Sequence, residues 1–312
     1  MLLACGAPPL HAQPSSAAEC TASAASTDAR LPALLAEARR QQGLFGGQEI
    51  DAEGRLVRSG HGEAEFDRNV GETEPTWRRV ESFWLALQGA GELRVRDSEG
   101  RGQRVDLLRQ AVTAAGNARL NSFGGGEREL GLSARETDTV LTSLLRASLV
   151  DTPWSAAFIS YVVRYAGFTE DEFRFSEAHA DYARQAFAGQ GAWRACDPAS
   201  TAPRPGDLLC STRAGAALID RFESLGEALA ADRSLPMHCD LVVAVDPDGR
   251  QASSIGGNVL QSVTLRRLHL QPEAGSSRVP PPLLLSPRYA ASARSAEAGF
   301  NDQPWVLLMQ LR

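Results

Sequence analysis

The chain has 312 residues, of which 43% are hydrophobic and 22% are charged, and its formal net charge is −6. This is the composition of a globular protein with a full core, and the lack of a basic block argues against nucleic acid as a partner. All 32 basic residues are arginine. Mechanisms that need a lysine amine are therefore excluded: phosphate-loop nucleotide binding, Schiff-base catalysis and Ser-x-x-Lys nucleophiles.

The N-terminal segment suggests export and a lipid anchor. Residues 1–6 (MLLACG) resemble the end of a bacterial lipoprotein signal, in which a small residue precedes the cysteine that receives lipid. Such a short pattern also arises by chance in a chain rich in Ala and Leu. Residues 6–30 are rich in Pro, Ala and Ser without periodicity, which predicts a disordered tether. We therefore expect a signal remnant and tether over residues 1–30, with a lipid on Cys5, followed by a single domain over residues 31–312.

The first half of the domain is predicted to be helical. Apolar residues at helical spacing indicate helices over residues 31–42, 77–87, 107–119 and 137–149. Residues 46–76 are rich in Gly, Asp and Glu with little periodicity, which predicts a long surface excursion. The glycine run 124–126 does not follow a strand or open a helix, so it indicates a loop and not a phosphate site.

The second half of the domain adds strands. Helices are predicted over residues 155–166, where Gly167 is a typical helix stop, and over residues 177–188. Short β-rich segments follow at residues 206–211, 239–245, 251–255, 259–268 and 305–311, with a turn at residues 246–249. Helices first and a small antiparallel sheet afterwards is an α+β pattern.

The cysteines fit an oxidising compartment such as the periplasm. Apart from Cys5, the chain has Cys20, Cys196, Cys210 and Cys239, an even set of which some members would pair after export. Because Cys20 falls in the predicted tether, we expect a disulfide between two of the other three, without a choice among them. Adjacent His and Cys at 238–239 face opposite sides of a strand and no zinc-ligand spacing occurs, so no metal and no cofactor is expected.

Three short segments carry residues suited to catalysis. Ser155 begins an apolar helix, where unpaired backbone N–H groups could activate a nucleophile or hold an oxyanion, although serine at this place is also a common helix cap. His238 opens an apolar strand and could act as a base, or be a buried structural histidine. Asn258 follows a glycine pair at the end of a strand, where a polar side chain can be aimed, or where an ordinary turn lies.

Taken together and in this order, the segments resemble a known superfamily. Residues 153–167 (PWSAAFISYVVRYAG) resemble the nucleophile helix of the papain-like cell-wall hydrolases, the CHAP and NlpC amidase-peptidases. Residues 205–208 (PGDL), the strand that His238 opens (HCDLVVAV) and residues 255–258 (IGGN) are similar to three further segments of that superfamily. The motif core covers about residues 150–270. As a whole, the chain most resembles an uncharacterised bacterial family, domain of unknown function 2272.

The resemblance implies a papain-like α+β domain and a periplasmic amide-bond hydrolase that acts on peptidoglycan peptides or a related amide substrate, with peptidoglycan or an envelope protein as its partner. Ser155 would be the nucleophile, His238 the base and Asn258 the residue that orients the imidazole. The chain departs from the superfamily at the decisive atom, since Ser155 stands where those enzymes have cysteine. A serine must lose its proton to the histidine during attack. The same cleft without a thiol also fits an inactive pseudo-hydrolase that binds peptidoglycan or a protein partner, or a disulfide-stapled envelope lipoprotein with no enzymatic role.

Three further residues are candidates for substrate contacts. Trp154 precedes the nucleophile position, and His179 lies on the following predicted helix with Tyr182 one turn on. An exposed helical histidine is the alternative for His179. Asp240 shares a strand face with His238 and could bond to it, or be a strand-end carboxylate satisfied elsewhere.

Overall fold

The computed structural model describes residues 20, 26–64, 74–87, 94–96, 102–104, 134–213, 219–231, 235–248, 250–289 and 299–312. Within these residues the chain is a mixed α+β protein with six helices and one large sheet, together with a two-stranded sheet. The predicted lipid site Cys5, the helix predicted over residues 107–119, the glycine run 124–126 and one residue of the predicted turn, Gly249, lie outside the described residues.

Five of the six helices correspond to predicted ones. The helices are α2 (Leu31–Leu44), α3 (Thr76–Leu85), α5 (Ala134–Asp151), α6 (Ser155–Tyr165), α7 (His179–Phe187) and α8 (Phe222–Ala231). Helix α8 was not predicted. It lies between two segments of the second half and buries Leu225 and Leu229.

The sheet is larger than the sequence analysis predicted. Its strands are β1 (Glu49–Ile50), β2 (Leu56–Arg58), β5 (Trp193–Cys196), β6 (Leu208–Thr212), β7 (Met237–Asp246), β8 (Gln251–Val259), β9 (Ser262–Pro272), β10 (Leu283–Leu285) and β11 (Trp305–Leu311). They form a nine-stranded sheet in the order β2-β1-β9-β8-β7-β6-β11-β5, with β10 also paired to β9. The prediction of a small sheet was therefore wrong, because short strands such as β5 and β10 carry too few residues to show a period.

The described part of the glycine-rich excursion predicted at residues 46–76, chiefly residues 46–64, is part of the body. Strand β1 pairs in parallel with β9 and antiparallel with β2, so the sheet is not purely antiparallel. Because β1 and β2 precede most of the helices in the chain, the order of helices first and strands afterwards is also broken. Further backbone hydrogen bonds attach the segment to the sheet. For example, the N–H of Glu63 donates to the carbonyl of Gln261. The segment also brings the carboxyl group of Glu63 into the interior. The two-stranded sheet, β3 (Arg94–Arg96) with β4 (Gly102–Arg104), is separate.

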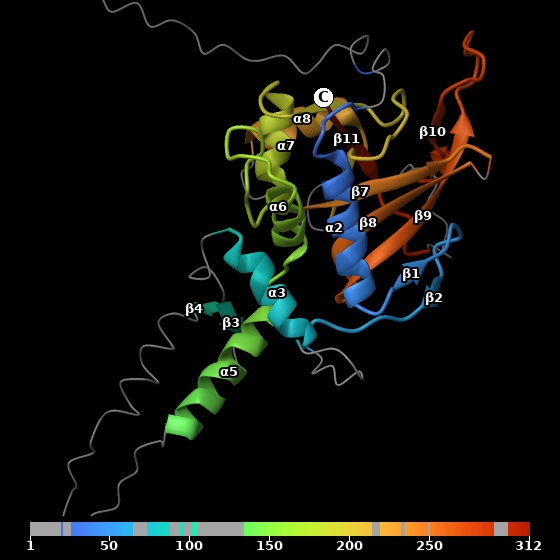
Figure 1. The fold of residues 1–312 in the computed structure, drawn as a ribbon. Helices are drawn as coiled ribbons and strands as arrows, with labels where there is room; N and C mark the ends of the chain where they lie inside the picture. The colour runs from blue at the N-terminus through green and yellow to red at the C-terminus, as the bar shows by residue number, and fades with distance from the viewer. Residues whose placement is uncertain are drawn as a thin grey trace, which may run out of the picture.

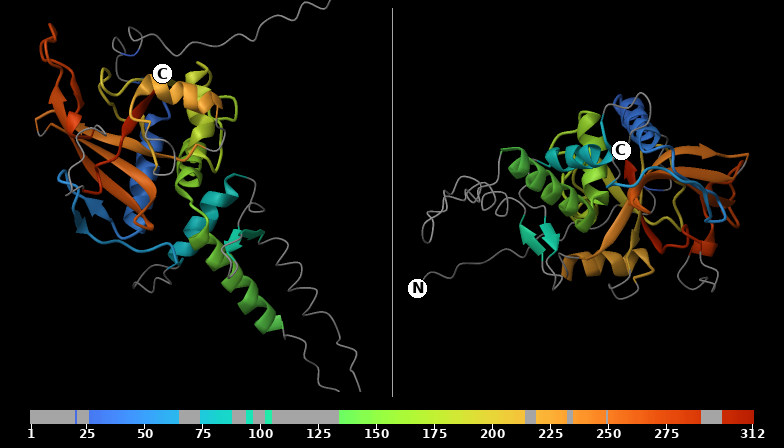
Figure 2. Two further views of the ribbon diagram at one scale, coloured as in Figure 1. Left: turned by 180° about the vertical axis from the view of Figure 1, so that it is seen from behind. Right: turned by 90° about the horizontal axis from the view of Figure 1, so that it is seen from below.

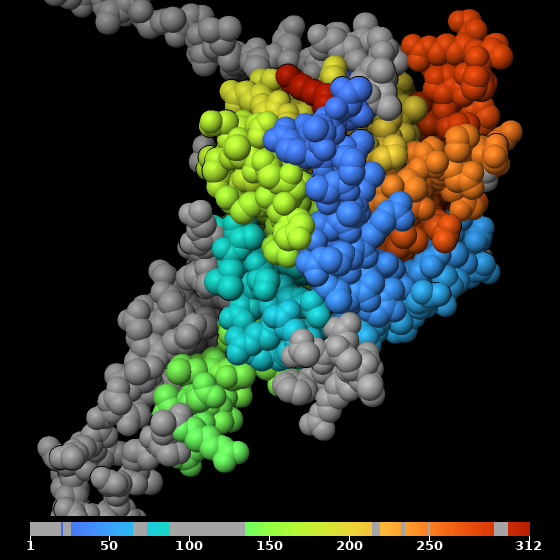
Figure 3. Space-filling model, in the orientation of Figure 1, coloured from blue at the N-terminus to red at the C-terminus, as the bar shows by residue number. Residues whose placement is uncertain are grey.

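Helices α2 and α6 lie side by side against the sheet (Figure 1), and α6 contacts β7 and β8. Helix α5 extends away from this body, as the left view of Figure 2 shows. The space-filling view shows α2 on the surface between the helices of the middle of the chain and the strands that follow (Figure 3). One continuous hydrophobic core joins helices α2, α3, α6 and α7 to the facing residues of the strands.

Helix α6 is fixed at both ends by local sequence. Its segment SAAFISYVVRY is apolar, and eight of its residues are buried. At its C-terminus Gly167 adopts φ +96°, and the N–H of Phe168 donates to the carbonyl of Val163. This is the left-handed termination that glycine favours. The start of α6, where Ser155 lies, is consequently held at a fixed place on the sheet.

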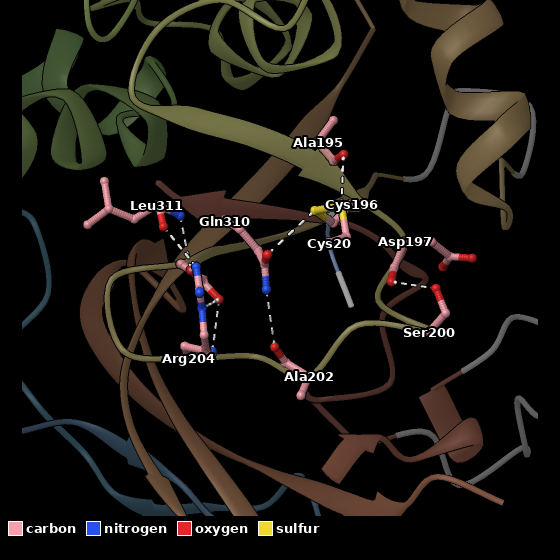
Figure 4. Close-up of a disulfide and its surroundings, with 10 residues drawn as sticks. Cys20, Ala195, Cys196, Asp197, Ser200, Ala202, Arg204, Gln310 and Leu311 are labelled. Atoms are coloured by element: carbon pink, nitrogen blue, oxygen red, sulfur yellow. Dashed lines mark hydrogen bonds and ion pairs between the residues drawn. A yellow bond between two sulfur atoms is a disulfide. The ribbon is translucent and has the colours of Figure 1, made fainter. Parts of the chain in front are cut away.

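Two disulfides are present. Cys210 and Cys239 are directly opposite each other on β6 and β7 and are bonded, so two of the three cysteines considered for a bridge pair. Cys196 bonds to Cys20, which the sequence analysis placed in the tether (Figure 4). Cys20 is buried, in a small cluster with Cys196 and Leu308. The N-terminal segment is therefore covalently attached to the body at residue 20, before the predicted domain start.

Among the described residues, no helix combines the length and the apolar character that crossing a membrane requires.

Candidate active site

Ser155 is the first residue of α6 and hydrogen-bonds to a histidine. Its Oγ lies 2.7 Å from His179 Nε2, and each of the two residues is only 4% exposed. His179 is the first residue of α7, so two helices meet at their N-terminal ends. From the sequence, His179 is expected either to contact substrate or to be exposed on its helix. The structure places it against the hydroxyl of the nucleophile candidate.

The other ring nitrogen of His179 is also occupied. Nδ1 hydrogen-bonds to the hydroxyl of Tyr182, one turn further along α7. A neutral imidazole has one donor and one acceptor nitrogen. When Nδ1–H donates to Tyr182, Nε2 is the acceptor and receives the proton of Ser155. Tyr182 can therefore hold the tautomer in which His179 acts as a base toward Ser155.

His179 is neutral in this environment. Burial lowers its pKa well below the usual value of 6.5, and the nearby His238 and Arg213 lower the pKa further. A neutral imidazole is the form that can accept a proton from a serine hydroxyl. The ring of His238 lies 5.4 Å from that of His179 between centroids, nearly edge to face.

His238 does not form the predicted bond to Ser155. An Arg213 amino group donates to its Nδ1 at 3.2 Å, and its Nε2 lies 2.7 Å from Asp240 Oδ1. Because arginine only donates, Nδ1 is an acceptor and Nε2 carries the proton that Asp240 accepts. Both ring nitrogens are therefore committed, and burial lowers the pKa of His238 against the raising effect of Asp240.

Asp240 is the centre of a buried polar network on the sheet. Besides His238, its carboxylate accepts from Ser254 Oγ at 3.2 Å and pairs with Arg266 Nε at 3.1 Å. Burial alone would raise the pKa of Asp240, but the facing His238 and Arg266 keep this pKa below its usual value. Gly256 makes the close approach possible, since a Cβ there would lie 1.8 Å from Asp240 Oδ1. This explains the first glycine of the GGN segment.

Asn258 hydrogen-bonds beside the start of α6 and does not orient His238. In the amide orientation that satisfies both of its groups, Nδ2 donates to Glu63 Oε2 and Oδ1 accepts from the N–H of Trp154, each at 3.2 Å. The predicted chain Ser155–His238–Asn258 is thus not a hydrogen-bonded triad in the structure. Instead Asn258 positions the residue before the nucleophile candidate.

Trp154 is part of the core. It is fully buried between Phe45 and Phe83, and its Nε1 donates to Glu63 Oε2 at 2.8 Å. The aromatic cluster covers this ring, so in the structure it is not exposed for the substrate contact that the sequence predicted. Trp154 fixes the helix start from the inside.

Glu63 is a residue of this site that the sequence analysis missed. It is 3% exposed, and burial raises its pKa to about 7, partly offset by the hydrogen bond from Trp154. It lies in the segment predicted as a surface excursion, where one of several acidic residues in a glycine-rich stretch gives no signal of burial. The backbone hydrogen bond from its N–H to the carbonyl of Gln261 holds it beside the β8–β9 turn, where its carboxyl group meets Asn258 and Trp154.

The backbone at the start of α6 can stabilise a negative charge. Trp154 is the N-cap residue, and within the described residues no side chain caps the helix. The first N–H groups of a helix lack intrahelical partners and carry the positive end of the helix dipole. The N–H groups of Ser155 and Ala156 are thus placed beside the Ser155 hydroxyl, as an oxyanion site requires.

A cavity of about 180 Å³ opens next to this cluster. Its walls contain His238 and Asn258, and the remaining lining residues are Ser211, Arg213, Val259, Leu260, Arg266, Phe300 and Gln303. No group of three or more His, Cys, Asp or Glu side chains suited to a metal ion occurs among the described residues.

Fold and site together define an α+β protein with a buried serine–histidine pair at the meeting point of two helix N-termini. The chain belongs to the bacterial family described as "Uncharacterized protein conserved in bacteria (DUF2272)", whose model matches residues 71–311. The resemblance to domain of unknown function 2272 is thereby confirmed. No curated protein matches the chain. No solved structure matches it either.

Proposed function

We propose that the protein is a serine-dependent amide hydrolase of the bacterial envelope that acts on peptidoglycan peptides. The observation that carries the proposal is the 2.7 Å contact between Ser155 Oγ and His179 Nε2 at the uncapped start of α6. The papain-like relationship suggested by the ordered sequence segments supplies the substrate class. The two disulfides support a location in the periplasm, where a lipid on Cys5 would tether the chain to the outer membrane.

The chemistry follows a serine mechanism with His179 in place of the predicted His238. Ser155 Oγ attacks the amide carbon while its proton passes to His179 Nε2, and the backbone N–H groups of α6 hold the oxyanion. His179 then protonates the leaving amine, which departs and leaves an ester on Ser155. A water molecule gives a proton to His179 and hydrolyses the ester, which restores the hydroxyl. Tyr182 acts as a positioning residue that accepts from Nδ1.

A second candidate is a binding protein that retains the cleft without turnover. The observation that favours it is the burial of both Ser155 and His179, each 4% exposed, while the cavity nearby is lined by other residues. In that case the serine–histidine bond would be structural, and peptidoglycan or a protein partner would occupy the cavity region.

Digestion of purified peptidoglycan distinguishes the two. The full chain, with Cys20 retained, would be compared with Ser155→Ala and Ser155→Cys, and released fragments read by mass spectrometry. Thermal unfolding of each variant verifies its fold. Release by the wild type and not by Ser155→Ala supports the hydrolase. The hydrolase proposal is overturned in favour of binding if only Ser155→Cys releases fragments. It is also overturned if none of the three proteins releases fragments while peptidoglycan still pulls the protein down.

A further inference from the structure

The cavity beside His238 has the features of a built site for a small anionic group. Its lining includes two arginines, Arg213 directly after β6 and Arg266 from β9. Arg266 is 6% exposed and its charge is balanced by Asp240 at 3.1 Å. Among the described residues, no carboxylate lies within ion-pairing distance of Arg213. With His238 neutral, the described residues of the cluster therefore retain one net positive charge.

A second, independent feature points to a ligand. Ser211 lies directly opposite His238 in the β6–β7 pair and lines the same cavity. Its side chain is 1% exposed, and within the described part of the chain its Oγ has no hydrogen-bond partner. A buried hydroxyl without a partner is destabilising, and most such groups are satisfied in folded proteins. Ser211 Oγ is thus a donor available to a group inside the cavity.

The rim of the cavity is apolar and its backbone is held in an uncommon conformation. Leu260 and Phe300 are 41% and 46% exposed, which is high for large apolar side chains. Leu260 and Gln261 form the two-residue turn between β8 and β9 with φ values of +51° and +62°, and Asn258 has φ +54°. Left-handed residues other than glycine are costly and concentrate at functional sites. The turn presents Leu260 at the cavity mouth.

We propose that this cavity is a carboxylate-binding subsite, in which Arg213 and Ser211 hold the carboxylate of a peptide while Leu260 and Phe300 contact the adjacent apolar side chain. A monoanion matches the single uncompensated positive charge, and a planar carboxylate matches the guanidinium fork. A phosphate dianion in this cavity would carry one negative charge more than Arg213 can balance. The inference deepens the proposed function, because it assigns the substrate of that site as a peptide with a carboxylate near the bond to be cut.

Calorimetric titration of the full-length Ser155→Ala protein tests the subsite without turnover. The probes are N-acetyl-alanyl-alanine, its C-terminal amide, N-acetyl-glutamyl amide and inorganic phosphate. We expect a carboxylate probe to bind at least tenfold more tightly than the neutral amide. The first and third probes differ in whether the carboxylate is terminal or on a side chain, so their ranking names the source. Tighter binding of phosphate than of either carboxylate, or equal binding of acid and amide, overturns the assignment.

Variants of the cavity complete the test. Arg213→Gln and, separately, Ser211→Val should each weaken carboxylate binding at least tenfold. Arg221→Gln, which removes an exposed arginine outside the cavity lining, should leave binding within twofold. Ser211→Val leaves the charge of Arg213 in place, so it still tests the subsite if Arg213→Gln fails to fold. Unchanged binding by folded Ser211→Val or Arg213→Gln would contradict the subsite. If the protein binds the carboxylate probe but the wild type does not cleave peptidoglycan, the subsite proposal is supported and the hydrolase proposal is contradicted.

Discussion

Ser155 Oγ and His179 Nε2 are 2.7 Å apart, while the second histidine of the site, His238, has both ring nitrogens engaged by Arg213 and Asp240. The two histidines therefore have different roles although their rings are close. His179 is placed to accept the proton of Ser155. His238 is held in a polar network that shapes the neighbouring cavity.

Substitution by glutamine separates these roles. Glutamine offers one acceptor and one donor, so His238→Gln can keep both the Arg213 and the Asp240 contacts, whereas His179→Gln cannot accept the serine proton as a base. We expect kcat/KM for peptidoglycan fragments to fall by about 10²–10⁴-fold in His179→Gln and by less than about tenfold in His238→Gln. A larger loss in His238→Gln than in His179→Gln would contradict the assignment.

Much of the fold was predictable because its long elements have clear periods. The helix over residues 155–166 and the strand opened by His238 were placed within a few residues of α6 and β7. Short strands such as β5 and the two-residue β1 were not, because so few residues show no alternation. Cys20 could not be assigned to the body either, since a disulfide partner is chosen by proximity in space and not by sequence.

The sequence singled out Ser155, His238 and Asn258 as site candidates, but it did not predict the hydrogen bonds that they form. Ser155, His238 and Asn258 come together in one region, but the partner of Ser155 is His179, from a helix that sequence alone left undecided between surface and site. Whether a helical histidine is buried depends on the neighbours that tertiary packing supplies. The sequence carries no signal for Glu63 for the same reason, because its contacts with Asn258 and Trp154 arise from tertiary packing.

Stability should depend on pH through Glu63. Its pKa is raised by burial to about 7, from 4.5 for an unperturbed carboxyl. The folded protein thus holds a proton that the unfolded chain releases between these values, and stability falls as pH rises through this window. In Glu63→Gln the contribution is removed, so the variant should gain stability relative to wild type from pH 4.5 to 8, by at most about 3 kcal/mol.

Urea unfolding of wild type and Glu63→Gln at several pH values gives the measurement. Asp207, whose pKa burial also raises to about 7, is present in both proteins and cancels in the difference. A difference in unfolding free energy that does not change with pH would show that Glu63 is ionised in the same way in both states.

The turn between β8 and β9 stores strain that glycine would relieve. Gln261 has φ +62°, a conformation that costs an L residue about 1–2 kcal/mol. Gln261→Gly should therefore raise the unfolding free energy by about 0.5–1 kcal/mol after the larger backbone entropy of glycine is deducted. Gln261→Ala keeps a Cβ in the same conformation and is the matched control. Equal midpoints of thermal unfolding for the two variants would argue against a strained turn.

The disulfide between Cys20 and Cys196 should contribute to the unfolding free energy of the whole domain, and not only attach the N-terminal segment to it. It closes a loop across a sequence separation of 176 residues, and removing native disulfides costs about 2–5 kcal/mol. We expect the double variant Cys20→Ala/Cys196→Ala to lose stability in this range in urea titrations. Ser26→Ala, which removes a hydrogen bond from the same segment to the carbonyl of Arg312, should change stability little. An unchanged urea midpoint in the double variant would mean that the bridge holds only the segment itself.

The most direct test of the account is whether Ser155 is a nucleophile activated by His179. The full chain would be treated with an alkyl fluorophosphonate, in which attack of the serine oxygen on phosphorus displaces fluoride. After trypsin digestion, tandem mass spectrometry of the peptide 147–164 locates the adduct. The account predicts one adduct on Ser155 in the wild type and none in His179→Gln. An absence of label on folded wild type, or equal labelling in His179→Gln, would contradict it.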